Sequence, residues 1–150
     1  MNANDISGII ERQRALFAAG TTLERDYRDS ALGALYRSIK FHEKDIAAAL
    51  RSDLGKSEAE SYMCETGMVL SSISYLRRNL SRLMRPRRTR TGMAQFPAHG
   101  ELRYVPYGTA LIIAPWNYPI LLSLEPLADA IAAGNTVVLK PSATAPATAE

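Results

Sequence analysis

Residues 109–114 read TALIIA and residues 136–140 read TVVLK, two short runs of mostly apolar residues. Continuous apolar runs of this length are typical of strands that are covered on both faces of a parallel sheet. Between them, residues 119–133 are long enough for a helix, and Gly134-Asn135 is a favourable cap for its C-terminus. Strand, helix and strand within about 32 residues predict a right-handed βαβ unit. The predicted fold class is therefore α/β.

The residues before this unit predict a series of helices. Apolar residues recur at helical spacing over residues 5–19, 21–41, 43–54 and 58–83. Thr21 with Glu24, and Ser57 with Glu60, fit capping boxes, in which side chains satisfy free backbone N–H groups at a helix start. After these helices, residues 101–106 alternate as a half-exposed strand would.

These patterns divide the chain into three parts. Residues 1–85 form a helical region, residues 86–107 a basic connection with a strand, and residues 108–150 the first βαβ unit of a Rossmann-like parallel sheet. A stable sheet needs more than two strands, and the sequence stops as residues 145–149 begin another helix. We therefore expect the chain to be truncated, the N-terminal portion of a nucleotide-binding domain.

Composition and charge exclude several classes of protein. With 47% hydrophobic and 22% charged residues and no low-complexity run, a disordered chain or coiled-coil array is not expected. A single cysteine excludes an internal disulfide framework, and with two distant histidines we predict no metal site. Residues 104–124 carry no charge, but their prolines and glycine favour a buried core over a membrane span. No secretory signal follows Met1, so the expected compartment is the cytoplasm.

The net charge of +3 is unevenly placed. No acidic residue lies between Glu65 and Glu101, whereas arginines crowd residues 77–90. Such a run could bind phosphates or a nucleic acid, or it could be a solvated helix end that pairs with acids elsewhere. No aromatic residue interleaves with the arginines to stack on bases, so we favour the solvated surface and predict no nucleic-acid partner.

The segment APWNYP at residues 114–119 carries the densest chemical signal, because open α/β sheets bind ligands at the carboxyl ends of strands. The Asn117 amide could donate a hydrogen bond to an oxyanion, or the side chain could be the N-cap of the following helix. Spacing alone leaves both open. Trp116 and Tyr118 could line a pocket or fill the core, and Lys140 could hold a ribose or phosphate or simply be an exposed lysine.

Several motifs occur together, in order and at spacings that point to one family. They are PYG at residues 106–108, PWNYP at 115–119, AAGN at 132–135 and VLKPS at 138–142, with FAAG at 17–20, Arg28 and DLGK at 53–56 before them. On these motifs the chain resembles the aldehyde dehydrogenase superfamily, and within it the short class 3 type that includes fatty and aromatic aldehyde dehydrogenases. The resemblance covers essentially the whole chain.

The resemblance implies an aldehyde dehydrogenase-like fold and NAD(P)-dependent oxidation of an aldehyde to a carboxylate. In the family, a cysteine thiolate attacks the aldehyde to give a thiohemiacetal, hydride passes to the nicotinamide, and water hydrolyses the resulting thioester with help from a glutamate. Asn117 occupies the position of the asparagine that stabilises the oxyanion, and Tyr118 would border the aldehyde tunnel. The residues implied to bind the cofactor are Ile113, Ala114, Pro115, Trp116, Lys140, Ser142 and Ala143.

Position 143 departs from the family pattern. Many members have a glutamate there that hydrogen-bonds the ribose hydroxyls, whereas this chain has Ala143. Without that carboxylate, repulsion toward a 2′-phosphate is removed, so we predict that NADP is tolerated as well as NAD. Residues 88–106 fall where the family builds its oligomerisation strands, which implies a homodimer.

The nucleophilic cysteine and the glutamate base belong to later parts of the family's sequence. Cys64 lies in a predicted N-terminal helix and does not replace that nucleophile. We therefore expect the 150-residue chain by itself to lack dehydrogenase activity. Two other functions stay open at this point: a non-catalytic fragment or interaction module, and a related enzyme that passes the acyl group to coenzyme A.

Overall fold

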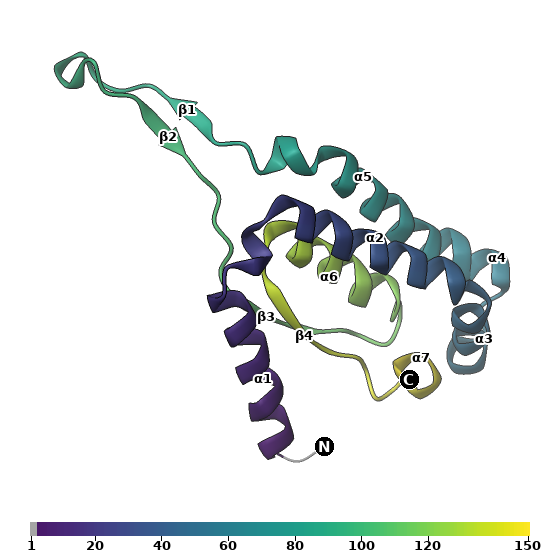
Figure 1. The fold of residues 1–150 in the computed structure, drawn as a ribbon. Coiled ribbons are helices and arrows are strands. Elements are labelled where there is room, and N and C mark those ends of the chain that lie inside the picture. The colour runs from purple at the N-terminus through teal and green to yellow at the C-terminus, as the bar shows by residue number, and fades with distance from the viewer. Residues whose placement is uncertain (1–2) are drawn as a thin grey trace.

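The computed structural model describes residues 3–150, in which helices pack against a small parallel sheet (Figure 1). The helices are α1 (Ala3–Ala18), α2 (Arg25–Phe41), α3 (Glu43–Leu54), α4 (Glu58–Ser61), α5 (Gly67–Leu83), α6 (Leu121–Ala133) and α7 (Pro146–Ala149). The strands are β1 (Arg87–Thr89), β2 (Gly100–Leu102), β3 (Thr109–Ile113) and β4 (Thr136–Lys140).

The hydrophobic core lies where α2, α5 and α6 pack against one another. Each helix places its apolar residues at spacings of three or four, so that they share one face. The buried members are Leu32, Ile39, Val69, Leu70, Ile73, Leu80, Ala128 and Ala132. Because α6 also contacts β3 and β4, this core fixes the sheet to the helical layer.

Strands β3 and β4 form the βαβ unit that the two apolar runs predict. They pair in parallel, with Thr109 opposite Thr136 and Ile113 opposite Lys140. Both α6 and α1 contact these strands. Gly134 ends α6 with a φ of 90°, a left-handed conformation that glycine adopts without steric cost, as the predicted cap requires.

Strands β1 and β2 form a separate antiparallel pair that projects from the body as a narrow arm (Figure 1). The strand predicted at residues 101–106 is wrong beyond Leu102, because residues 103–107 form no strand. The ladder stops where Leu102 pairs with Arg87, and Pro106 has no N–H with which to continue one. Tyr104 lies beyond the ladder with its side chain exposed.

Two predictions about helix starts have different outcomes. Thr21 does not cap α2, because it lies in a 3-10 turn between the first two helices, and Glu24 is the N-cap residue without a side-chain bond. Ser57 does cap α4, since its hydroxyl accepts a hydrogen bond from the Glu60 N–H at 3.1 Å. The long helix predicted after Ser57 is interrupted at Tyr62–Thr66 by a π turn, a wider coil that is frequent at functional sites.

Candidate functional site

The carboxyl ends of β3 and β4 bring together three of the residues predicted to bind a cofactor. Ile113 and Lys140 are neighbours in the parallel register, and the Ala114 N–H donates to the Lys140 carbonyl at 3.1 Å. Lys140 is exposed, and Ile113 leaves 67% of its surface uncovered. A cation beside exposed apolar side chains at this edge suits a ligand with both anionic and flat apolar parts.

The other predicted cofactor residues lie on the two segments that leave this edge. Pro115 and Trp116 follow β3 and are exposed, and Trp116 keeps 53% of its surface uncovered. Ser142 and Ala143 follow β4, where the Ser142 hydroxyl accepts a hydrogen bond from the Thr144 N–H at 3.3 Å and Ala143 is exposed. These groups fit a nucleotide, because a lysine and a hydroxyl can donate hydrogen bonds to it and an uncovered aromatic ring can pack against it.

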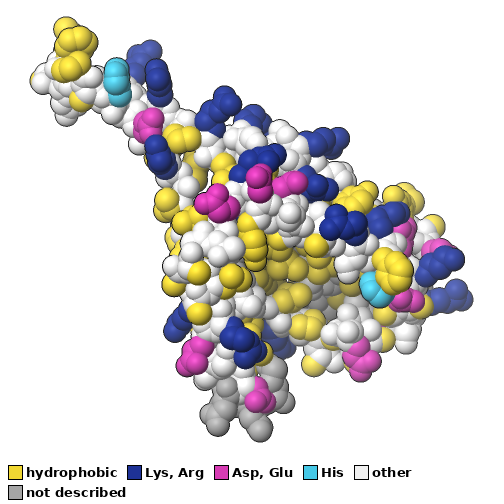
Figure 2. All heavy atoms as spheres, in the orientation of Figure 1, with side chains coloured by type: hydrophobic (Ala, Val, Ile, Leu, Met, Phe, Trp, Pro, Cys, Tyr) yellow, Lys and Arg dark blue, Asp and Glu magenta, His cyan; other side chains and the backbone are white. Residues whose placement is uncertain are grey.

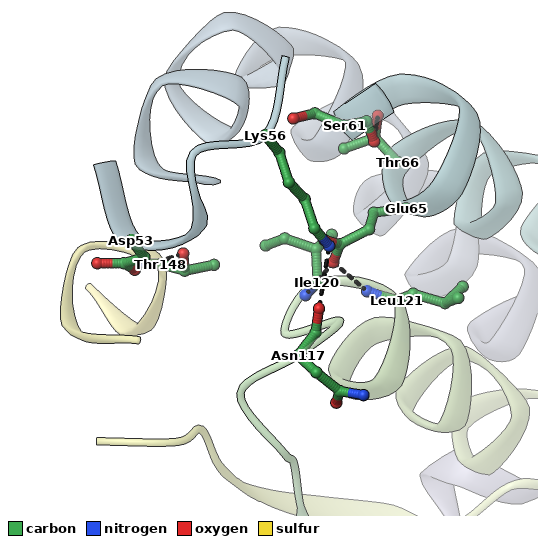
Figure 3. A network of polar contacts seen from close by, with 9 residues as sticks. All are labelled: Asp53, Lys56, Ser61, Glu65, Thr66, Asn117, Ile120, Leu121 and Thr148. Atoms are coloured by element: carbon green, nitrogen blue, oxygen red, sulfur yellow. Dashed lines mark hydrogen bonds and ion pairs between the residues drawn. The ribbon is translucent and has the colours of Figure 1, made fainter. Parts of the chain in front are cut away.

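Asn117 is exposed and does not cap α6. The N-cap residue is Ile120, which offers no side-chain hydrogen bond. The Asn117 backbone carbonyl accepts a hydrogen bond from Lys56 Nζ at 3.0 Å, while its side chain points away from that contact (Figure 3). Of the two interpretations that the sequence left open, the N-cap is wrong, and the amide N–H groups face outward.

Two buried charged residues that the sequence did not single out for the site organise this turn (Figure 3). Lys56 Nζ lies 2.5 Å from Glu65 Oε1, and the two side chains are 9% and 0% exposed. Glu65 Oε2 accepts hydrogen bonds from the backbone N–H groups of Ile120 at 2.8 Å and Leu121 at 3.2 Å. Glu65 thus satisfies the start of α6 and places a negative charge where the helix dipole favours one.

The Lys56 ammonium also contacts Tyr118. Its nitrogen lies 4.1 Å from the centroid of the tyrosine ring, within the range of a cation–π contact. Tyr118 is 40% exposed, so it belongs to the surface of the turn and not to the core. Lys56 therefore touches both the backbone of Asn117 and the ring of the next residue.

The sequence does hold a signal for Glu65. It falls on the same helical face as Val69 and Ile73, at spacings of four, so that a carboxylate enters an apolar stripe. A buried carboxylate needs a charged or hydrogen-bonding partner, which predicts a network at this position. Its partners on α6 could not be predicted, because they are backbone groups of a distant segment. Lys56 is part of the DLGK motif, and the motif by itself predicts neither its burial nor its partners.

Comparison with known proteins gives the family. Residues 1–150 match the aldehyde dehydrogenase family over the whole chain. The chain belongs to the aldehyde dehydrogenase family. Aldehyde dehydrogenase family 3 member H1 of Arabidopsis thaliana is 41% identical over 143 residues, which are 95% of this chain and 30% of that protein. The dimeric NADP-preferring aldehyde dehydrogenase of Canis lupus familiaris is 40% identical over 141 residues, 91% of this chain and 30% of that protein.

A solved aldehyde dehydrogenase structure confirms the predicted fold class. The substrate-bound state of Staphylococcus aureus AldH superimposes with a TM-score of 0.94 at 40% identity, over 99% of this chain and 32% of that one. The resemblance to the class 3 type is likewise confirmed by the family 3 relative. The chain spans about 30% of the length of the curated aldehyde dehydrogenases that it matches.

The arginine-rich surface of this aldehyde dehydrogenase chain, residues 77–90, is partly paired. Arg77 donates from Nε and Nη2 to the Asp29 carboxylate at 2.9 and 3.2 Å, a bidentate contact that joins α5 to α2. The hydrogen bond from Arg77 holds the pKa of Asp29 below its ordinary value. Figure 2 shows Lys and Arg side chains along the arm and along the α5 side of the molecule. Arg77, one arginine of this run, is thus neutralised by an acid on the neighbouring helix.

Asp53 of the DLGK motif ties the segment after β4 to α3 (Figure 3). Its carboxylate accepts hydrogen bonds from the N–H groups of Ala147 at 3.2 Å and Thr148 at 2.8 Å, and from the Thr148 hydroxyl at 2.7 Å. Partial burial acts to raise the pKa of Asp53, but these hydrogen bonds outweigh it and the pKa lies below its ordinary value. The motif therefore fixes α7 through Asp53 and the turn before α6 through Lys56.

Within residues 3–150, no three His, Cys, Asp or Glu side chains gather into a group that could hold a metal ion. None of the helices in the same range combines the length and the apolar character that crossing a bilayer requires.

Proposed function

We propose that the complete protein containing this chain oxidises an aldehyde to a carboxylate with NAD(P)⁺. The observation that carries the proposal is the Asn117 amide, which is exposed at the carboxyl end of β3 and free of the capping role that Glu65 fills. Membership of the aldehyde dehydrogenase family supports it, as do relatives that bear that name.

Asn117 is proposed as the donor to the oxyanion. When a nucleophile attacks an aldehyde, charge develops on the carbonyl oxygen, and an amide N–H that is already aimed at it lowers the barrier. The donor works best when its backbone is held before the substrate arrives, because no reorganisation is then needed. The backbone of Asn117 is held by Lys56 in this way, and Tyr118 would border the aldehyde beside it.

The cofactor, when bound, supplies the acceptor for the hydride that leaves the substrate carbon. Lys140 would hydrogen-bond the adenosine ribose, with the Ser142 hydroxyl beside it. The segment Ile113–Trp116 would form the apolar wall of the groove. We propose that both NAD and NADP are accepted, because Ala143 puts no carboxylate near a 2′-phosphate. The canine relative is named NADP-preferring, which supports this choice.

The intact mass of the polypeptide expressed from its natural reading frame is measured first. Steady-state kinetics of that polypeptide then test the role of Asn117. Asn117→Ala should lower kcat by roughly 10²–10³-fold, the usual effect of losing one oxyanion donor. Asn117→Asp is the matched variant, because it keeps the size but loses the N–H donors, and it should lower kcat at least as far. An Asn117→Ala enzyme with unchanged kcat would overturn the role, and a product that forms only with coenzyme A would favour the acylating alternative.

Position 143 provides the test of the cofactor proposal. Efficiencies with NAD and NADP should differ by less than about a hundredfold in the unchanged enzyme, since no carboxylate opposes the 2′-phosphate. Ala143→Glu should lower the efficiency with NADP more than that with NAD, whereas Ala143→Gln, of the same size without the charge, should change the ratio little. A strong preference for NAD in the unchanged enzyme would contradict the proposal.

We also propose that the complete protein is a homodimer and resides in the cytoplasm. The arm supports the first point, because Met93 and Phe96 near its end are 97% and 86% exposed, and such apolar side chains favour contact with another surface. The canine relative is named dimeric. Light scattering tests the assembly, and Phe96→Asp is expected to weaken it. Fractionation of cells that carry the tagged protein tests the compartment.

A further inference from the structure

The turn that carries Asn117 is held at both ends by one buried ion pair (Figure 3). At its start, Lys56 Nζ donates to the Asn117 carbonyl at 3.0 Å. At its end, Glu65 Oε2 accepts from the N–H groups of Ile120 and Leu121 at 2.8 and 3.2 Å. Because Lys56 and Glu65 are themselves 2.5 Å apart, the two ends of the turn are linked through a single salt bridge.

Among residues 3–150, the Asn117 carbonyl has a hydrogen-bond partner, and the side-chain amide is left free to meet a ligand. Its carbonyl is bound by Lys56, while the side-chain amide points away from the pair. The Tyr118 ring is held by the same ammonium at 4.1 Å. The pair therefore fixes the backbone from which the Asn117 side chain projects, without occupying the amide itself.

We propose that Lys56 and Glu65 are positioning residues, which hold Asn117 so that its amide meets the oxyanion. This inference rests on the proposed function, because it assigns a cause to the geometry of the proposed donor. An amide N–H stabilises developing charge only when it is aimed to within a fraction of an ångström, and supporting contacts set that aim. The Glu65 carboxylate, which binds the first N–H groups of α6, and the Lys56 ammonium, which binds the Asn117 carbonyl, provide such contacts.

A merely structural role accounts for the arrangement less well. A helix start is usually capped by a nearby Ser, Thr, Asp or Asn, whereas α6 relies on a charged residue from another helix. Buried salt bridges contribute little net stability, because desolvation of the two charges offsets their attraction. Glu65 also lies in the π turn Tyr62–Thr66, and such turns are frequent at functional sites.

The test is a kinetic double-mutant cycle in the complete enzyme. Glu65→Gln should lower kcat by roughly tenfold to a hundredfold, as expected for a misplaced donor, while the KM values for aldehyde and cofactor stay within about threefold. In an Asn117→Ala background, the same Glu65→Gln change should lower kcat no further, because the donor that it positions is gone. Asp29→Asn, which breaks the Asp29–Arg77 pair away from this turn, is the matched control and should leave kcat unchanged.

Hydrogen exchange provides a readout that does not depend on turnover. Glu65→Gln should increase exchange at residues 117–121 and leave the Asp29–Arg77 region unchanged. If Glu65→Gln does not accumulate as folded protein, the double variant Lys56→Met with Glu65→Gln carries the same test, because it buries no unpaired charge and removes the hydrogen bond to the Asn117 carbonyl.

The outcomes separate this inference from the proposed function. Unchanged exchange at residues 117–121, or losses from Glu65→Gln and Asn117→Ala that multiply in the double variant, would overturn the positioning role. An unchanged enzyme that oxidises no aldehyde would overturn the proposed function, and with it a catalytic purpose for the pair. Raised exchange together with a non-additive cycle is the result that we expect.

Discussion

The carboxylate of Glu65 accepts a 2.8 Å hydrogen bond from the backbone N–H of Ile120, 55 positions later in the chain. The first N–H groups of α6, the helix of the βαβ unit, are therefore bound by a side chain from the N-terminal helical layer. Its own start, Pro119-Ile120-Leu121, contains no side chain that could serve as a cap. The start of α6 therefore depends on the packing of these two layers against each other.

Breaking the buried pair should cost more than removing it. Lys56→Met leaves the Glu65 carboxylate buried without its cation, so the free energy of unfolding should fall by about 3–5 kcal/mol. The double variant Lys56→Met with Glu65→Gln buries no charge, and the introduced amide carbonyl can still accept from Ile120, so it should lose less than Lys56→Met alone. Chemical denaturation of Lys56→Met, Glu65→Gln and the double variant measures the three losses. Losses that simply add would show that the two side chains are independent.

The π turn should make one glycine irreplaceable. A Cβ at Gly67 would lie 2.7 Å from the Tyr62 carbonyl oxygen, so Gly67→Ala must distort the backbone and should destabilise the protein. At Gly8, in α1, a Cβ would meet only the end of the Arg12 side chain at 3.6 Å. Gly8→Ala should therefore stabilise by up to about 1 kcal/mol, as helix propensity predicts. The two melting temperatures should move in opposite directions, and a stabilising Gly67→Ala would contradict the argument.

The βαβ unit was predictable because its signals are local. The apolar runs gave β4 at residues 136–140 and β3 to within one residue, and Gly134 marked the end of α6. The π turn was not predictable, because helical spacing continues across residues 58–83 without a local signal for a wider coil.

In the candidate site, too, local signals were predictable and long-range contacts were not. Ile113, Ala114 and Lys140 meet because parallel strands end at one edge, which the sequence implies. The sequence could not predict that Asn117 leaves the start of α6 uncapped, because this depends on a carboxylate that reaches α6 from another helix. The role of Lys56 depends on the same long-range packing, since its hydrogen-bond acceptor is the backbone carbonyl of Asn117.

Replacement of Arg28 by lysine should destabilise the protein. Its buried guanidinium donates to the carbonyls of Thr22 at 2.7 Å, Leu23 at 3.2 Å and Ala132 at 3.1 Å, which ties α2 to the end of α6. A lysine ammonium lacks the planar fork that reaches these three acceptors, so Arg28→Lys should lower the free energy of unfolding by at least about 2 kcal/mol. Arg51→Lys, at an exposed position of α3, is the control and should change stability little. Equal effects of the two substitutions, measured by denaturation, would contradict a role for the fork.

Acid should weaken the contact between α2 and α5 through Asp29. The hydrogen bond from Arg77 lowers the pKa of Asp29 in the folded protein. Its contribution to stability is therefore fully present above the unfolded pKa of about 3.9, and it is lost as the pH falls through the lower folded pKa. Asp29→Asn should lower the melting temperature near neutral pH and have much less effect near about pH 2, where the unchanged carboxyl is protonated as well.

Thermal unfolding at the two pH values measures this difference for Asp29→Asn. The matched control is Asp26→Asn on the same helix, because the Asp26 side chain is 91% exposed and such surface pairs contribute little. We expect Asp26→Asn to leave the melting temperature nearly unchanged at both pH values. A loss for Asp29→Asn that is equally large in acid would mean that the carboxylate charge is not what joins α2 to α5.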